Sequence, residues 1–483
     1  MTAVDLAPDV AARMAYLSSR RWYAGKGREV SAVSLVRLPW LTSPDATPAL
    51  RTELIDVSYS DGHRHVYQLP LAYREHGDAA LDHAFIGYFP PEPGWGERVA
   101  YDLPYDRDAA ATFMRFLSSG HAAGGMRAHV VGEIDLDQDP LVLSGEQSNT
   151  SIVYGDRMLL KLFRRVQPGR NPDIEAHQAF TRAGETVAPQ LLGWLESDPD
   201  GDAEVRALGG DLGMVTQFLP SATDGWALAT ASVRDLLAEA DLHADEVGGD
   251  FASEAERLGA VTARMHHDLA DAFGTSAWAA EDLTRLTRAL SGRFDHALAR
   301  VPVLAGFDRA VRAVYAEVEG LTPPVTAHRV HGDFHLGQTM RTIPGWRIID
   351  FEGEPGAPYE SRVGFDSPMR DVAGLLRSID YAAAHLLKDE PASSQSQFRA
   401  SEWRARNTEA FLRGYRVETV GAQPERADRE GVQTGVHPES WSANDRTLLR
   451  AYELDKAVYE AVYEADMRPD WITIPLAALE RLT

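Results

Sequence analysis

Cysteine is absent from this sequence of 483 residues. Disulfide bonds, thiolate nucleophiles and cysteine-ligated zinc are therefore excluded. No stretch approaches the ~18 uninterrupted apolar residues that a membrane-spanning helix needs. The first 21 residues lack the basic start and apolar core of a signal peptide. With neither cysteine nor a signal, we expect a cytoplasmic protein.

Positive charge is also scarce. The chain has 48 lysines and arginines against 72 aspartates and glutamates, a formal net charge of −24. Phosphate-rich partners need basic patches, so this balance argues against nucleic acid and against anionic membranes as main partners. Hydrophobic residues make up 44% of the chain and charged residues 25%, as in ordinary globular proteins.

The length suffices for about three domains of ~150 residues each. We predict an α+β cap domain over residues 1–95, a mixed region with a nucleotide-binding sheet over 96–219, and a mainly helical region over 220–483. A Pro- and Gly-rich cluster at 90–94 marks the first boundary.

Local patterns predict several elements. β-rich runs at 54–60 and 65–71 flank Asp61-Gly62, a hairpin signal. Further strands are expected at 151–154, 158–163, 329–330 and 346–349, and apolar spacing predicts helices at 11–21, 108–117, 232–240, 252–272 and 283–299. Asn171-Pro172 followed by acids predicts a helix start. The polar composition of 389–440 predicts loops or insertions around a helix.

The strongest chemical signal is the run from His331 through Asp333 to Gln338, followed by Asp350-Phe351 after an apolar segment. Phosphoryl transfer needs one carboxylate at the acceptor hydroxyl and others to hold Mg²⁺. Kinase catalytic loops carry an amide side chain five residues after the catalytic Asp, the spacing of Gln338 from Asp333. His335 has two interpretations. It either has a functional role, adjusting the loop or contacting metal or substrate, or it only forms a hydrogen bond with a backbone carbonyl.

The upstream half is expected to bind the phosphates of ATP. Lys161 lies in an apolar strand and is predicted to reach them, with Glu175 in the next helix as its partner; a surface lysine and a capping acid are the alternative. In the loop 144–151 the candidate phosphate contacts are Ser148, Asn149 and Thr150, although turn chemistry explains its composition equally well. Residues 214–218 are either the hinge that reads adenine or a core strand.

Two further blocks have both structural and functional interpretations. Residues 366–371 predict a helix start with Ser367 as the cap, and Arg370 or Asp371 is a candidate to brace the catalytic loop. Residues 22–28 predict a tight turn anchored by Trp22, with a functional flap as the alternative.

Taken together, these motifs resemble those of the maltokinases, actinobacterial enzymes that transfer phosphate from ATP to maltose. That family is similar in fold to protein kinases and aminoglycoside phosphotransferases. The resemblance is carried by ordered blocks at residues 21–28, 146–151, 171–175, 246–250, 331–338, 350–355, 366–371 and 452–460.

The resemblance implies an α+β, bilobal, protein-kinase-like fold with an N-terminal cap domain and a mainly helical C-terminal lobe. It implies Asp333 as catalytic base, Gln338 and Asp350 as Mg²⁺ ligands, and Lys161 on the phosphates of ATP. The sugar acceptor is expected in the C-terminal lobe. Its candidate contacts are His335, Glu352 and one face of the helix 454–464, which carries Lys456, Tyr459, Glu460 and Tyr463.

We therefore expect a Mg²⁺-dependent kinase that makes maltose 1-phosphate and ADP, feeds α-glucan synthesis and works beside a trehalose synthase. Alternatives are a glucosamine kinase acting at O6, an aminoglycoside phosphotransferase, and a non-catalytic pseudokinase partner of a trehalose synthase. For the sugar-wall helix, an amphipathic helix with buried tyrosines is the alternative. Residues 388–441 look longer than expected for the family, which leaves the acceptor open.

Overall fold

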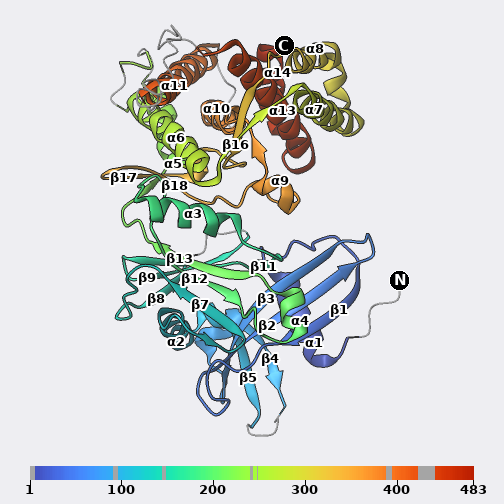
Figure 1. Ribbon diagram of the computed structural model, residues 1–483, viewed down its shortest axis with the longest axis vertical. Helices are drawn as coiled ribbons and strands as arrows, with labels where there is room; N and C mark the ends of the chain where they lie inside the picture. The colour runs from blue at the N-terminus through green and yellow to red at the C-terminus, as the bar shows by residue number, and fades with distance from the viewer. Residues whose placement is uncertain are drawn as a thin grey trace. The chain divides into compact units, whose positions relative to one another are not determined.

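The computed structural model describes residues 6–90, 96–143, 148–239, 243–246, 249–387, 394–421 and 441–483. It divides into two compact units (Figure 1): unit 1 comprises Met1–Thr181 and Pro189–Pro220, and unit 2 comprises Arg182–Ala188 and Ser221–Thr483. This division lies next to the predicted boundary at residue 219. The cluster predicted to mark the first boundary falls largely on 91–95, outside the described residues.

The first sheet of unit 1 is antiparallel, with strand order β1-β2-β3-β5-β4 and β11 paired to β3. Its strands are β1 (Val30–Arg37), β2 (Ala49–Tyr59), β3 (Arg64–Arg74), β4 (Phe85–Phe89), β5 (Arg98–Asp102) and β11 (Arg165–Val166). β2 and β3 form the hairpin predicted at Asp61-Gly62. Helix α1 (Pro8–Ser19) confirms the first predicted helix. Trp22 and Tyr23 are buried beside Tyr67, as the turn interpretation of that block expects.

The second sheet of unit 1 has the order β6-β7-β12-β13-β10-β9-β8. Its strands are β6 (Ala122–Ala123), β7 (Met126–Val130), β8 (Pro140–Val142), β9 (Thr150–Tyr154), β10 (Met158–Leu162), β12 (Leu191–Ser197) and β13 (Asp211–Gln217), and the helices of the unit include α2 (Arg107–Ser118), α3 (Pro172–Ala183) and α4 (Ala203–Leu208). Lys161 on β10 pairs with Ser151 on β9 and Met214 on β13, so it lies inside the sheet.

Unit 2 is mainly helical. Its helices are α5 (Gly225–Ala238), α6 (Ala252–Phe273), α7 (Ala280–Arg300), α8 (Asp308–Glu319), α9 (Tyr359–Val363), α10 (Met369–His385), α11 (Ser394–Gly421), α13 (Ala443–Met467) and α14 (Thr473–Leu482). α6 packs along α11, and α10 packs along α13. Among helices in the described ranges, none combines the length and apolar character needed to cross a bilayer.

The polar region predicted as loops around a helix contains a longer helix than expected. α11 spans 28 residues and buries Trp403, Phe411 and Tyr415. The buried side chains of this helix are few and lie among many polar residues. The composition of the region therefore does not indicate a long helix with a buried face. Residues 388–393 and 422–440 of the region lie outside the described residues.

Two small antiparallel sheets of unit 2 position the loops that carry the predicted catalytic motifs. Their orders are β14-β17-β18 and β15-β16-β19. The strands are β14 (Thr223–Asp224), β15 (Thr275–Trp278), β16 (Val325–Arg329), β17 (Thr339–Thr342), β18 (Gly345–Ile348) and β19 (Phe365–Asp366). The run His331–Gln338 therefore leaves the end of β16, and Asp350 follows β18.

Candidate active site

Asp371 at the start of α10 fixes the backbone that precedes Asp333. Its carboxylate accepts the backbone N–H of His331 at 2.7 Å and that of Gly332 at 2.8 Å, and Nε2 of His266 lies 3.0 Å away. Burial alone raises the pKa of Asp371, but His266, His331 and the N–H of Gly332 outweigh it and hold the pKa at about 2. The predicted bracing contact is therefore present, made by an ionised carboxylate.

The loop of residues 331–338, the predicted catalytic loop, lies directly on α10. A Cβ atom at Gly374 would come within 2.5 Å of the carbonyl oxygen of Phe334, so only glycine permits this approach. The backbone N–H of Leu336 donates to Ser378 Oγ on the same helix at 3.1 Å. Gly332, with a φ of +85°, turns the chain into the loop.

Two histidines organise the loop from inside. Nε2 of His331 lies 3.0 Å from the carbonyl oxygen of Ile349, which ties the loop to the residue before Asp350. Nδ1 of His335 accepts the backbone N–H of Gly337 at 3.1 Å. Burial lowers the pKa of His335, so its ring is neutral. This contact is consistent with a role of His335 in shaping the loop. Its backbone partner is an N–H group and not the carbonyl group that the structural alternative expected.

Gln338 and Asp350 meet at one point. Nε2 of Gln338 donates to Oδ2 of Asp350 at 3.0 Å. Asp350 has a φ of +67°, a left-handed backbone conformation that Asp adopts more readily than most non-glycine residues. Amide and carboxylate oxygens are the donors that Mg²⁺ favours, so the pair fits such an ion. Glu352 is half-buried, and its carbonyl oxygen accepts from Arg362 at 3.0 Å.

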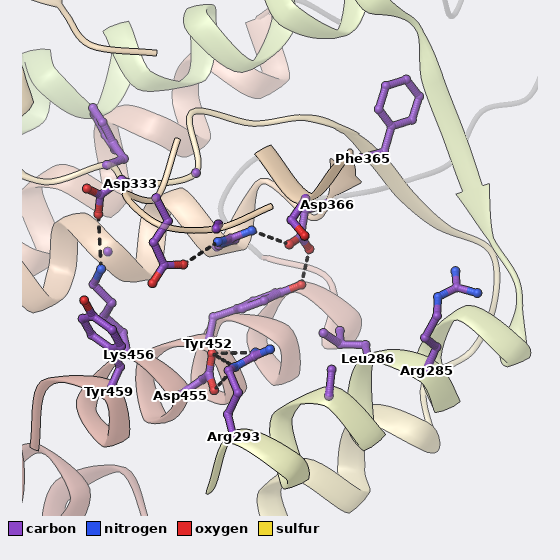
Figure 2. Close-up of a pocket in the computed structure, with 18 of the residues that line it drawn as sticks. Arg285, Leu286, Arg293, Asp333, Phe365, Asp366, Tyr452, Asp455, Lys456 and Tyr459 are labelled. Carbon is purple, nitrogen blue, oxygen red and sulfur yellow. Dashed lines mark hydrogen bonds and ion pairs between the residues drawn. The ribbon is translucent and has the colours of Figure 1, made fainter. Parts of the chain in front are cut away.

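Asp333 lines a pocket of about 510 Å³ within unit 2 (Figure 2). Nζ of Lys456 on α13 lies 3.4 Å from Oδ1 of Asp333. Burial alone lowers the pKa of Lys456, but the charges of Asp333, Glu460 and Glu354 outweigh it, so the pKa is raised and the ammonium is retained. The pocket thus places a cation beside the carboxylate that the sequence analysis predicts as the general base.

Ion pairs surround the rest of this pocket. Asp455 binds Arg293 at 2.7 Å. Arg370 lies 3.2 Å from both Glu354 and Asp366. The remaining lining carboxylate, Asp282, is paired with Arg285, and the hydroxyl of Tyr452 donates to Asp366. Every described carboxylate lining the pocket therefore has an arginine or lysine partner.

The residues of α13 that line the pocket lie one helical turn nearer its N-terminus than the predicted ones. Lys456 and Tyr459 line it as predicted, but Tyr452 and Asp455 complete the face. Glu460 instead accepts two hydrogen bonds from Arg377 on α10, at 2.7 and 3.0 Å. Tyr463, His335 and Glu352 are not among the described lining residues. The ion pair with Arg377 directs Glu460 toward α10, and the residues of α13 that line the pocket lie one turn nearer its N-terminus.

In unit 1, Lys161 binds Asp173, a partner that the sequence analysis missed. Nζ of Lys161 lies 2.9 Å from Oδ2 of Asp173, and Nδ1 of His177 lies 3.1 Å from Oδ1. Burial raises the pKa of Asp173, but Lys161 and His177 outweigh it and hold the pKa well below its usual range. Asn171 Oδ1 accepts the N–H of Asp173 at 2.8 Å, so the predicted cap orients this carboxylate. Glu175 is half-buried one turn into α3.

The candidate phosphate loop is only partly within the described residues, which omit 144–147. Nδ2 of Asn149 donates to Oγ of the exposed Ser148 at 3.2 Å. Oγ1 of Thr150 accepts from Nε of the buried Arg164 at 2.8 Å, and Arg164 pairs with Asp102 at 2.6 Å. The hydroxyl oxygen of Thr150 is therefore occupied by a hydrogen bond inside unit 1.

Part of this chain matches a known family, and curated proteins are similar to it. Residues 16–106 match the maltokinase N-terminal cap domain family. A curated glucosamine kinase from Streptacidiphilus jiangxiensis is 30% identical over 347 residues, covering 70% of this chain and 72% of the relative. A glucosamine kinase from Mycolicibacterium smegmatis is 28% identical over 346 residues, covering 70% of this chain and 78% of the relative.

The fold has solved counterparts. A glucosamine kinase in complex with glucosamine, ADP and inorganic phosphate superposes with a TM-score of 0.66 at 22% identity, covering 96% of this chain and 98% of the other. This likeness confirms the predicted kinase-like fold, and the match over residues 16–106 confirms the cap domain. The chain belongs to the maltokinase and glucosamine kinase family and is a sugar phosphotransferase.

Proposed function

We propose that this protein uses ATP and Mg²⁺ to phosphorylate the anomeric hydroxyl of maltose, yielding maltose 1-phosphate and ADP. The observation that carries the proposal is the pocket at Asp333, in which each described carboxylate already has a cationic partner. Paired carboxylates favour a neutral acceptor whose hydroxyl groups they bind. The volume of about 510 Å³ exceeds the needs of one hexose ring.

In the proposed reaction, Asp333 orients the anomeric hydroxyl and takes its proton as the new oxygen–phosphorus bond forms and ADP leaves. Lys456 holds this carboxylate in place. Lys161, fixed by Asp173, contacts the phosphates of ATP, and Ser148 and Asn149 are further candidate contacts there. Gln338 and Asp350 would hold Mg²⁺, which would supply positive charge to offset the negative charge of the phosphates.

A glucosamine kinase acting at O6 is the second candidate. The observation that favours it is the name of the curated relatives, which are 30% and 28% identical to this chain. An amino sugar needs a carboxylate for its ammonium group. Three of the five lining carboxylates have a cation of their own, which weakens this candidate, whereas Glu354 and Asp366 share Arg370 and leave one negative charge for an ammonium group.

The proposed product also suggests a setting. The proposed partner is a trehalose synthase that supplies maltose. The proposed use of the product is α-glucan synthesis, and the proposed location is the cytoplasm. All three rest on the resemblance to maltokinases.

Acceptor profiling tests the proposed function. ADP release is measured with ATP and Mg²⁺ against maltose, glucosamine, glucose, trehalose and kanamycin, and phosphorus NMR reads the position of the new phosphate. We expect maltose to give the highest kcat/KM, with phosphate at the anomeric position. Preferential phosphorylation of glucosamine at O6 would assign the chain to the second candidate, and kanamycin phosphorylation to an aminoglycoside kinase.

A further inference from the structure

The pocket that contains Asp333 continues well beyond the acceptor hydroxyl. Figure 2 shows Asp333, Lys456 and Tyr459 at one end, and Phe365, Leu286 and Arg285 at the other. The paired side chains of Tyr452, Asp455 and Arg293 lie between these ends. The pocket is therefore elongated, with the proposed reacting group at one end only.

The chemical character of the wall changes along the pocket. Near Asp333 and in the middle it consists mostly of ion pairs, whose oxygens and N–H groups suit sugar hydroxyls. At the far end it includes Leu286 and Phe365. Trp278 also lines the pocket and lies two residues before the start of α7, the helix that carries Leu286. These residues come from β15, α7 and β19, and β15 and β19 flank β16 in one sheet.

The far wall exposes apolar surface that the core does not use. The side chain of Phe365 is 38% exposed, and Trp278 and Leu286 are half-buried. Aromatic and aliphatic surfaces of this kind bind the apolar face of a sugar ring, while neighbouring polar groups bind its hydroxyl edge. Arg285 and Ala289 are exposed beside them, so the far end borders solvent.

We propose that Trp278, Leu286 and Phe365 form a distal acceptor subsite, which holds the sugar ring remote from the phosphorylated hydroxyl. This subsite selects a neutral acceptor of two rings over a single hexose, because only the longer molecule reaches both ends. The inference rests on the proposed function and assigns specificity to residues outside the catalytic loop and α13.

Kinetics of the variants Trp278→Ala and Phe365→Ala test the subsite. Each is expected to raise the KM for maltose about tenfold through lost ring contact, with kcat within twofold and the KM for ATP unchanged. The KM for glucose is expected to stay at the wild-type value in both. Phe398→Ala is the matched control, because Phe398 is 62% exposed on α11 and does not line this pocket. Melting curves verify that each variant is folded.

Each outcome decides the matter. A maltose KM that stays unchanged in both folded variants, in an enzyme that phosphorylates maltose, would overturn the subsite and leave the proposed function intact. An equal rise of the glucose and maltose KM values would also overturn it, because the residues would then serve the reacting ring. A wild-type enzyme that prefers glucosamine would remove both the proposed function and the two-ring subsite.

Discussion

Lys456 reaches the catalytic loop from a helix far along the chain. Its Nζ lies 3.4 Å from Oδ1 of Asp333, and the two residues are 123 positions apart. We expect Lys456→Met to lower kcat with maltose by about 10²-fold, because a misplaced catalytic group loses about that much. Lys456→Arg keeps the charge and should recover part of the loss. Steady-state kinetics of the three proteins provide the measurement.

The matched control for this change is Lys26→Met. Lys26 is exposed in unit 1, where its Nζ lies 3.4 Å from the carbonyl oxygen of Arg21. Its loss should leave kcat unchanged. A Lys456→Met enzyme with wild-type kcat would show that Asp333 needs no help from α13.

The loss of one glycine tests the contact between α10 and the catalytic loop. Gly374→Ala places a Cβ atom 2.5 Å from the carbonyl oxygen of Phe334, and backbone must move to relieve it. We expect the free energy of unfolding to fall by about 1–3 kcal/mol and kcat to fall with it. Gly292→Ala on α7 is the control, since no atom lies within 4 Å of its added Cβ. That change should stabilise the protein by about 0.5–1 kcal/mol in urea unfolding.

The junction of β13 and α3 predicts a pH dependence. Burial raises the pKa of Asp211 to about 6, although Arg170 and the N–H of Asn171 oppose it. The unfolded carboxyl titrates near 3.8, so the folded state holds this proton more tightly and is favoured at low pH. This stabilisation is complete below pH 3.8 and disappears as the pH rises through 6.

Asp211→Asn removes that titration. Urea unfolding at pH 4 and pH 7 should show the variant gaining about 2 kcal/mol relative to wild type across this interval. All other groups titrate alike in both proteins and cancel in the comparison. If the two proteins differ in free energy of unfolding by the same amount at both pH values, the pKa of Asp211 is not raised by burial.

At the scale of elements, periodic and turn signals predicted most of what the structure contains. The hairpin at Asp61-Gly62 and the pair β9 and β10 formed where the patterns placed them. α11 was underestimated, because three buried aromatic residues in a polar stretch give little periodic signal. Elements whose apolar residues are regularly spaced are readable from sequence, whereas elements that depend on a distant partner are not.

The same limit applies to the site. Asp333, Gln338 and Asp350 could be proposed from the sequence because their spacing is local, and their roles stay predictions. The Lys161–Asp173 pair was missed because Asp173 and Glu175 both fit the start of α3, and their spacing does not show that Asp173 reaches Lys161. The predicted pocket-lining residues of α13 were one turn too far toward its C-terminus for a related reason: Glu460 pairs with Arg377 on α10, a distant partner.

The whole molecule carries a net charge of −24, and ADP is also anionic. Long-range repulsion should therefore make nucleotide binding depend on Mg²⁺, which lowers the charge of the ligand. We expect ADP with Mg²⁺ to raise the melting temperature and EDTA to abolish most of that rise. At a ligand concentration of 100 times Kd the stabilisation should be about 2.7 kcal/mol.

Asp350→Asn tests whether the proposed metal ligands are responsible. The folded variant should lose the Mg²⁺-dependent part of the melting shift. Asp308→Asn, at an exposed pair with Arg312, should retain it. An Asp350→Asn protein with the full Mg²⁺-dependent shift would contradict the assignment of the metal site.

The most direct test of the account is the rate of sugar phosphorylation by Asp333→Asn, compared with wild type and Asp308→Asn under saturating ATP, Mg²⁺ and maltose. Loss of a general base lowers rates by about 10²–10⁴-fold. The account predicts a fall in kcat within this range, with an unchanged melting temperature and unchanged stabilisation by ADP and Mg²⁺. Formation of sugar phosphate at the wild-type rate by the folded variant would contradict it.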